Sequence, residues 1–372
     1  MSDNRINKII ADTFLEMADA LETGEFGKKP VIGIAVEGSE HGDEVFQQAI
    51  ADAERKGLKA LLIQGEDSHK EMEAKLASGE IDGAVTMHYP FPIGVSTVGK
   101  VITPGVGKAM YLATTTGTSD TDRICGMIKN AIYGIIAAKA DGIENPTVGI
   151  ANIDGARQAE KALLKLKENG YNIQFSESMR ADGGIVMRGN DLLAGTPDIM
   201  VMDSLTGNLM MKIFSSYTTG GSYESLGFGY GPGIGEGFKD LVLIISRASG
   251  APVISGAVEF ATSLVKHDWK KIADAEFAAA KKAGLDKILA EAKPAKKEAA
   301  AAEEEVKMPP KEVVTASIPG IEVMDLEDAV KALWKAGIYA ESGMGCTGPI
   351  VLMAPEKKEK AEEILKAAGY IG

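Results

Sequence analysis

Short apolar runs alternate with amphipathic helical segments along the first 290 residues of the chain. The runs are continuously apolar, as in parallel strands that are buried on both faces, and the segments between them carry apolar residues at helical spacing. The runs that we interpret as strands are 31–36, 58–65, 84–87, 108–114, 199–202 and 241–245. This alternation predicts an α/β fold with a doubly wound, mostly parallel sheet in three layers, with helices on both faces.

Further segments are predicted before, within and after this α/β region. An apolar repeat from Ile6 to Leu21 stops at Gly24, which predicts an amphipathic helix before the first strand. After the last strand, two helices are predicted between about 252 and 292. The alternating glycines at 227–237 follow a predicted helix rather than a strand, so they do not match the dinucleotide-binding fingerprint. We interpret this run as a flexible lid or a docking surface.

The composition changes abruptly after residue 290. The stretch 291–312 is dense in Ala, Lys, Glu and Pro and has almost no large apolar side chain, so it buries too little surface to offset the entropy of ordering. We interpret it as a linker between a body at 1–290 and a small module at 313–372. The pattern of the module predicts a β-α-β-β-α order, an α+β unit with a small core of its own.

Charge and cysteine content limit the partners and the cellular location that we expect for this protein. The chain has 40 basic and 53 acidic residues, and the formal charge of −13 argues against nucleic acid or an anionic membrane as a partner. Two cysteines, Cys125 and Cys346, imply no disulfide framework, so a reducing cytoplasm is the simplest location. No apolar stretch is long enough to span a bilayer, and the acidic first helix is unlike a secretory signal.

A dense group of polar residues follows the predicted strand at 199–202. In chain order they are an acid, a hydroxyl-rich turn with a glycine, an amide and a cation: Asp203, Ser204, Thr206, Gly207, Asn208 and Lys212. We predict that a helix begins at Asn208, with Lys212 one turn further along the same face. Helix N-termini at the carboxyl ends of parallel strands favour anions, so this group predicts a phosphate or oxyanion site. The alternative is an ordinary βα unit in which Asp203 caps the helix and Lys212 is solvated.

A second candidate stretch comes at the end of the predicted strand at 108–114. It is rich in hydroxyls, and we predict that Thr115, Thr116 and Gly117 contact a phosphate or an acyl carbonyl. The alternative is a β-rich turn in which Ser119 or Asp120 caps the next helix. The histidines, including His88, are interpreted as structural because no nucleophile is paired with them in the sequence.

The two cysteines have different surroundings. Cys125 lies in a strongly apolar helical segment, which predicts a buried and unreactive thiol. Cys346 lies in ESGMGCTGP, between two predicted strands, where glycines such as Gly345 leave a neighbouring side chain approachable. We predict a reactive thiolate that carries an acyl group as a thioester. The alternatives are an incidental surface cysteine or a lone metal ligand; without a second Cys or His nearby, no zinc site is expected.

The order of segments in the body resembles the PlsX-type phosphate acyltransferases. The resemblance covers about 30–293 and is strongest from TVGIANID to PDIMVMDSLTGNLMMK. It implies a fold of the isocitrate and isopropylmalate dehydrogenase type, and conversion of a thioester and inorganic phosphate into an acyl phosphate. That family has a Met-Gly-Gly-Asp turn near the first strand, whereas this chain has EGSEHGDE from Glu37, so a long-chain acyl donor is not implied.

With the linker and GMGCTGPIVLMAPE included, the whole chain resembles the smaller (alpha) subunits of component C of glycine, sarcosine and betaine reductases, which are oxidoreductase complexes of amino-acid fermentation. In that family, selenoprotein component A delivers a two-carbon unit, component C holds it as an acetyl thioester, and phosphate releases acetyl phosphate. The resemblance implies that Cys346 is the acetylated thiol, that Asn208 and Lys212 hold phosphate and the oxyanion, and that Asp203 orients Lys212 or a phosphate proton. It also implies component A, the larger (beta) subunit and a second copy of the chain as partners, with inorganic phosphate as substrate and no cofactor or metal.

Two other functions stay open at this point. A stand-alone phosphate acyltransferase acting on acyl-carrier or coenzyme A thioesters would not need Cys346. A non-catalytic scaffold, whose cysteine module docks a catalytic partner, would tolerate replacement of Asn208 and Lys212. The sequence does not indicate which amine feeds the complex.

Overall fold

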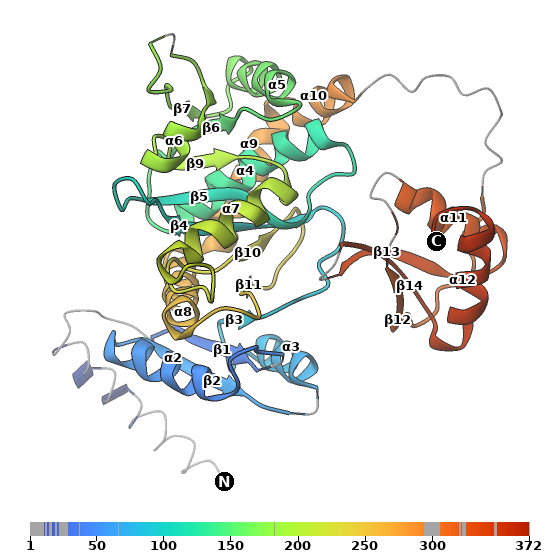
Figure 1. Cartoon of the computed structure of the whole chain (residues 1–372), viewed down its shortest axis with the longest axis horizontal. Coiled ribbons are helices and arrows are strands. Elements are labelled where there is room, and N and C mark those ends of the chain that lie inside the picture. Colours follow the sequence, from blue (N-terminus) through green and yellow to red (C-terminus); the bar gives the residue numbers. More distant parts are fainter. Residues whose placement is uncertain are drawn as a thin grey trace.

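The computed structural model describes residues 11, 13–14, 17–18, 21, 29–36, 38–65, 67–181, 183–293, 306–319, 321, 325–345 and 348–371. Its body is a sheet of 11 strands with helices packed on both faces (Figure 1). The strands are β1 (Val31–Ala35), β2 (Lys59–Ile63), β3 (Gly83–Thr86), β4 (Val95–Ile102), β5 (Ala109–Thr118), β6 (Thr147–Ala151), β7 (Gln174–Phe175), β8 (Val186–Met187), β9 (Ile199–Val201), β10 (Gly231–Ile234) and β11 (Val242–Ile244). The predicted first helix falls largely outside the described residues.

The strand order is β2-β1-β3-β11-β10-β4-β5-β9-β6-β7, with β8 also paired to β6. Most neighbours are parallel, as predicted, but β4 runs antiparallel to both β5 and β10, and β10 runs antiparallel to β11. The sequence pattern does not predict strand β4, because prolines and glycines surround it. The α/β class and the mostly parallel sheet are confirmed.

The helices divide between the two faces. They are α2 (Glu44–Arg55), α3 (Ser68–Ser78), α4 (Arg123–Ala140), α5 (Ala156–Glu168), α6 (Gly189–Ala194), α7 (Ser204–Ser216), the 3₁₀ turn η1 (Tyr217–Thr219), α8 (Ala251–Lys266), α9 (Trp269–Lys282) and α10 (Leu285–Ala292). One apolar core joins the sheet to α2, α4, α5, α8, α9 and α10, and a second core on the opposite face joins it to α3 and α7. Strand β9 supplies Ile199 and Val201 to the first core and Met200 to the second, as the alternation of side chains in a strand requires.

Two predictions in this region are wrong. The glycine-rich run is neither a lid nor a docking surface, because it forms β10 inside the sheet. A Cβ on Gly231 would lie 1.7 Å from the carbonyl oxygen of Val98, so the strand needs glycine in order to approach β4. The region 252–292 holds three helices rather than two, because Asp268 caps α9 by accepting a hydrogen bond from the Lys271 N–H and Gly284 separates α9 from α10.

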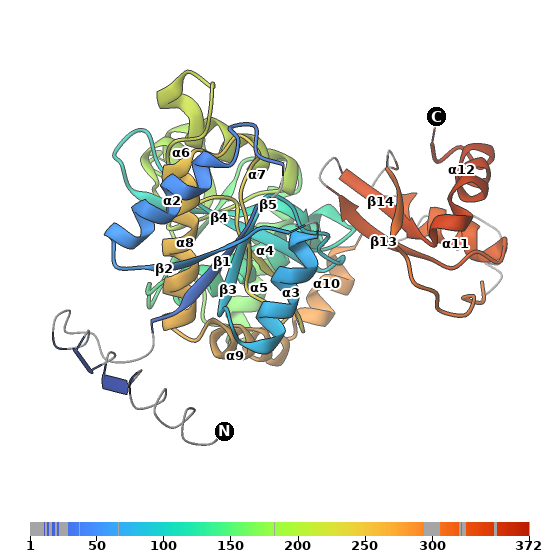
Figure 2. The same ribbon diagram turned by 90° about the horizontal axis from the view of Figure 1, so that it is seen from below.

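The C-terminal module is a separate three-stranded antiparallel sheet with two helices on it. Its elements are β12 (Ala316–Pro319), α11 (Leu326–Lys335), β13 (Ala340–Gly345), β14 (Gly348–Met353), the 3₁₀ turn η3 (Pro355–Lys357) and α12 (Lys358–Ala367). The β-α-β-β-α order is confirmed, and the module has its own apolar core. Figures 1 and 2 show the module beside the body, with β13 on the side that faces it. Residues 294–305 of the predicted linker lie outside the described residues.

Candidate active site

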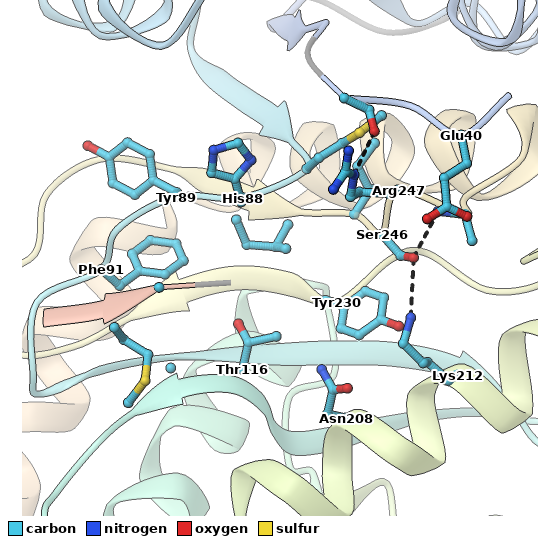
Figure 3. Close-up of a pocket in the computed structure, with 18 residues that line it drawn as sticks. Glu40, His88, Tyr89, Phe91, Thr116, Asn208, Lys212, Tyr230, Ser246 and Arg247 are labelled. Atoms are coloured by element: carbon cyan, nitrogen blue, oxygen red, sulfur yellow. Dashed lines mark hydrogen bonds between the residues drawn. The ribbon is translucent and has the colours of Figure 1, made fainter. Parts of the chain in front are cut away.

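A cavity of about 570 Å³ lies where several strands of the body end and where the module meets the body. Loops that follow β1, β3 and β11 form one side, and the end of β5 and one face of α7 form the other (Figure 3). The polar and charged side chains on its walls are Glu40, His88, Thr116, Asn208, Lys212, Tyr230, Ser246 and Arg247. Ligands of open α/β sheets bind outside the carboxyl ends of the strands, so this is the expected place for a substrate.

Lys212 of α7 provides a positive charge in this cavity. Its Nζ atom lies 3.4 Å from the Oγ atom of Ser246 and 3.5 Å from the Oε1 atom of Glu224, and its side chain keeps 53% of its surface exposed. These contacts are long for a charged group, so Lys212 is oriented by its neighbours and still open to an anion from the cavity. Lys212 is therefore neither a freely solvated surface lysine nor part of a closed ion pair.

Behind Lys212 lies a buried carboxylate that the sequence analysis missed. Glu224 is 2% exposed, and it accepts hydrogen bonds from the Tyr230 hydroxyl at 2.8 Å and the Ser249 hydroxyl at 2.9 Å. Burial, with the Glu224 carboxylate beside it, raises the pKa of Tyr230 far above its usual range, so the phenol stays protonated and donates. Glu224 thus ties α7 to the segment that follows β11.

That segment, SRASG at 246–250, carries two further cavity residues that the sequence analysis missed. Arg247 donates from Nε to the Gly38 carbonyl at 2.8 Å, and its own carbonyl accepts from the Glu40 N–H at 2.9 Å. The Ser246 hydroxyl accepts from the Ala248 N–H at 3.1 Å. The signal was present in the sequence: a hydroxyl, a cation and small residues come between a predicted strand and a predicted helix, the pattern used to identify 203–212.

Asn208 lies one helical turn before Lys212 on the same face of α7, as predicted. Its Nδ2 atom donates to the Thr115 carbonyl at 3.1 Å, which uses one of the two amide hydrogens. Thr116 and Gly117 of β5 lie on the same wall of the cavity. The structure therefore brings Asn208, Lys212, Thr116 and Gly117 together.

The module contributes the tip of β13 to this cavity. Met344 and Gly345 line it, and the Sδ atom of Met344 accepts from the Thr118 hydroxyl of β5 at 3.9 Å. Residues 341–345 belong to β13, which pairs with β14 through Gly345 and Gly348, so the two strands reach further into this glycine-rich stretch than predicted. Cys346 is the next residue in the sequence, and it lies outside the described residues.

Comparison with known proteins gives the family. A family model described as "Fatty acid synthesis protein" matches residues 19–352. The chain is 59% identical to the glycine/sarcosine/betaine reductase complex component C subunit alpha of Peptoclostridium acidaminophilum, over the full length of both proteins. The chain belongs to the fatty acid synthesis protein family and, within it, to the component C alpha subunits.

More distant members of the family cover parts of the body. A phosphate acyltransferase of Caldicellulosiruptor saccharolyticus is 24% identical over 213 residues, which is 55% of each chain. A phosphate acyltransferase of Thermosipho africanus is 32% identical over 90 residues, 23% of this chain and 25% of the relative. Both resemblances stated from the sequence, to the PlsX-type acyltransferases and to component C, are confirmed.

In this member of the family, the residues between β9 and Asn208 do not form the predicted turn. Helix α7 begins at Ser204, so Asn208 and Lys212 lie inside the helix and its N-terminus is not at the cavity wall they share. Thr206 lines a second cavity of about 230 Å³ instead. Gly207 is required for packing, because a Cβ there would lie 1.7 Å from the Thr114 carbonyl oxygen. The sequence pattern could not separate a hydroxyl-rich turn from the first turn of a helix.

Asp203 caps α7 and does not orient Lys212. Its carboxylate accepts hydrogen bonds from the Thr206 N–H and hydroxyl, both at 2.9 Å, and pairs with Arg123 at 2.8 Å. Burial acts to raise the pKa of Asp203, but the bonds from Thr206 and Arg123 outweigh it and hold the pKa below its usual range. The predicted orientation of Lys212 by Asp203 is therefore wrong, the alternative of a capping aspartate is confirmed, and a role of Asp203 toward a phosphate proton stays a prediction.

Of the predicted contact residues on β5, some line the cavity and one is buried. Thr115 is fully buried and donates to the Tyr230 carbonyl at 2.7 Å, so it joins β5 to β10 and is not available to a ligand. The hydroxyls lie within strand β5 rather than in a turn, and the helix that follows is capped by Asp122, not by Ser119 or Asp120. Thr116 and Gly117 remain as cavity residues.

The prediction of a buried Cys125 is confirmed, and its low reactivity stays a prediction. The side chain is fully buried in α4, and its Sγ atom donates to the Leu289 carbonyl at 3.4 Å. Burial, followed by the neighbouring Asp122 carboxylate, raises the pKa of the Cys125 thiol to about 12. Within the part of the chain that the structure describes, no helix is long and apolar enough to cross a membrane.

Proposed function

We propose that this chain forms acetyl phosphate within a glycine, sarcosine or betaine reductase complex, with Cys346 holding the acetyl group as a thioester. The observation that carries the proposal is the position of Met344 and Gly345. These residues directly precede Cys346 in the sequence, and they line the cavity that also contains Asn208 and Lys212. In this proposal, a thioester on the residue that follows them reacts with an anion held by Lys212.

The proposed reaction is phosphorolysis of the thioester. An unprotonated oxygen of inorganic phosphate attacks the carbonyl carbon, which forms the new C–O bond and a tetrahedral oxyanion. The C–S bond then breaks, acetyl phosphate leaves, and the cysteine sulfur departs as a thiolate that takes a proton from solvent. The chain itself needs to bind phosphate, orient it and stabilise the oxyanion.

The cavity residues divide into these roles. Lys212, Arg247 and the Ser246 hydroxyl bind phosphate, since α7 and the loop after β11 bring two cations and a hydroxyl to the same cavity from its two sides. The second amide hydrogen of Asn208 stabilises the oxyanion, because its first is held by the Thr115 carbonyl and fixes the amide plane. Loss of one such donor typically lowers the rate by about a hundredfold or more.

The partners in this proposal go beyond the printed name of one relative. The similar protein of Peptoclostridium acidaminophilum is named as the alpha subunit of component C of a complex. We propose that this chain assembles with a larger beta subunit, receives its two-carbon unit from the selenoprotein component A, and works in the cytoplasm with inorganic phosphate as substrate and no cofactor. Formation of a homodimer is part of the same proposal.

Intact mass and isotope exchange test this function. The full chain and a Cys346→Ser variant are incubated with acetyl phosphate, weighed, and then given radioactive phosphate. We expect an acetyl adduct on the wild type alone, and exchange of label into acetyl phosphate by the wild type alone. If both proteins exchanged label equally with acetyl-coenzyme A as donor, the chain would be a stand-alone phosphate acyltransferase. If neither protein exchanged label, and Lys212→Ala was equally inactive, the chain would be a non-catalytic scaffold.

A further inference from the structure

One carboxylate lies on the wall of the cavity and another lies behind it, and the one behind it has donors on both oxygens. Glu224 accepts from Tyr230 and Ser249 and lies 3.5 Å from Lys212, so both of its oxygens already have donors. It is buried behind Lys212, and its side chain is not part of the cavity wall. Glu224 orients Lys212 and is not free to contact a second anion.

Glu40 differs from Glu224 in both exposure and hydrogen bonding. It is exposed, it lies on the cavity wall, and Figure 3 shows its side chain at the same end of the cavity as Ser246 and Lys212. Its backbone N–H is held by the Arg247 carbonyl at 2.9 Å, so the loop that carries it is fixed to the segment after β11. Among the residues that the structure describes, none forms a hydrogen bond or ion pair with the Glu40 carboxylate.

An unoccupied carboxylate is unexpected beside a site for an anion. An ionised carboxylate only accepts hydrogen bonds, so it repels an oxyanion whose oxygens are all unprotonated. An oxyanion that keeps one proton can donate it to the carboxylate, which turns the repulsion into a hydrogen bond. Hydrogen phosphate has such a proton at neutral pH, and sulfate, which has the same tetrahedral shape, does not.

We propose that Glu40 is a specificity-determining residue that selects hydrogen phosphate over oxyanions without a proton. This inference rests on the phosphate site proposed above. Lys212, Arg247 and the Ser246 hydroxyl attract phosphate and sulfate alike, because both are tetrahedral dianions, so these groups cannot separate them. Discrimination requires an acceptor that penalises the wrong anion, and Glu40 is the cavity carboxylate placed to supply it.

Titration calorimetry on the full chain tests this role without any thioester. Sodium phosphate and sodium sulfate are titrated into the wild type, Glu40→Gln and Glu54→Gln, an exposed carboxylate of α2 that is not on the cavity wall. We expect the wild type and Glu54→Gln to bind phosphate at least about tenfold more tightly than sulfate. In Glu40→Gln the ratio should fall below about threefold, mainly because sulfate binds better once the like charge is gone.

The outcomes separate this inference from the proposed function. Equal binding of the two anions by the wild type, or an unchanged ratio in Glu40→Gln, would overturn the role of Glu40 and leave the phosphate site standing. A wild type that binds neither anion would overturn both. A ratio that collapses in Glu40→Gln supports the role of Glu40 even where the exchange assay detects no acetyl phosphate. Unfolding curves of the three proteins confirm that the variants are folded.

Discussion

The hydroxyl of Thr118, at the end of β5, lies 3.9 Å from the sulfur of Met344, in β13 of the C-terminal module. A second contact between the two parts is apolar, because Ile93 of the body packs against the core of the module. Both contacts lie near the cavity, since Phe91 and Gly117 are on its wall beside Met344. The module therefore meets the body beside the cavity that we propose as the phosphate site.

Replacement of Met344 should weaken the contact between the module and the body. We expect Met344→Ala to slow label exchange into acetyl phosphate by about three- to tenfold. The variant loses the sulfur contact and buried apolar area, which together contribute roughly 1 kcal/mol to the docking of the module on the body. The measurement is the exchange rate at saturating phosphate. Met308→Ala removes an exposed methionine away from the cavity and should have the wild-type rate; an equal loss in both variants would show that the contact has no specific role.

Lys212 and Asn208 should affect different steps. Lys212→Ala removes the charge that we propose binds phosphate before and during the reaction, so the KM for phosphate should rise at least about tenfold with a smaller change in kcat. Asn208→Ala removes the donor that we propose for the oxyanion, so kcat should fall by about a hundredfold with little change in KM. Steady-state kinetics with varied phosphate separates the two. The assigned roles would be wrong if both variants raised KM and left kcat unchanged.

The fold could be predicted from the sequence where hydrophobic periodicity decides it. Buried strands such as Ile199–Val201 and the amphipathic helices of the module have a clear pattern. Prediction failed at β10, whose glycines look like a loop, because the need for glycine comes from its neighbour: the Val98 carbonyl lies where a Cβ of Gly231 would be. That contact joins residues far apart in the sequence, so no local pattern contains it.

The site shows the same division. Asn208 and Lys212 were found because they share one face of one helix, which spacing alone reveals. Asp203 was misassigned because its partner Arg123 comes from another helix, and Glu224 was missed because only the fold buries it behind Lys212. Placement that depends on one element could be predicted, and placement that depends on how elements meet could not.

The capping role of Asp203 predicts a variant with normal chemistry and altered stability. Asp203→Asn keeps a capping side chain but loses the charge that pairs with Arg123, so kcat and KM should stay within about twofold of wild type. The free energy of unfolding should fall by about 1 kcal/mol at pH 7. Because the folded-state pKa of Asp203 is lowered, its contribution is present above the unfolded pKa of about 4 and is lost as pH falls through the folded pKa.

Urea unfolding at several pH values measures this contribution. The difference between wild type and Asp203→Asn should be constant near neutrality and shrink below about pH 4. A difference that grew with falling pH would contradict the ion pair with Arg123. A large loss of kcat in a folded Asp203→Asn protein would restore a direct role for Asp203 in the reaction.

A buried ion pair should matter more for stability than any exposed one. Lys100 lies 2.5 Å from Asp141, with side chains 15% and 5% exposed, and the Tyr111 hydroxyl donates to the same carboxylate. Lys100→Met leaves that buried carboxylate without its cation, which should cost about 3–5 kcal/mol in the free energy of unfolding. Lys56→Met, which breaks the half-exposed pair with Glu259, should cost less than about 1 kcal/mol. Similar losses in the two variants would contradict the argument from burial.

The contrast between the two cysteines can be measured by alkylation of the native protein. Burial raises the pKa of Cys125 to about 12, so it remains a thiol at pH 8, and its sulfur is closed off inside α4. Native wild type should therefore take up one equivalent of iodoacetamide at pH 8, Cys125→Ala should also take up one, and Cys346→Ser none, with intact mass as the readout. In urea, the wild type should take up two, because unfolding exposes Cys125. Labelling of native Cys346→Ser would show that Cys125 is accessible. Intact mass alone could then no longer assign the acetyl adduct to Cys346.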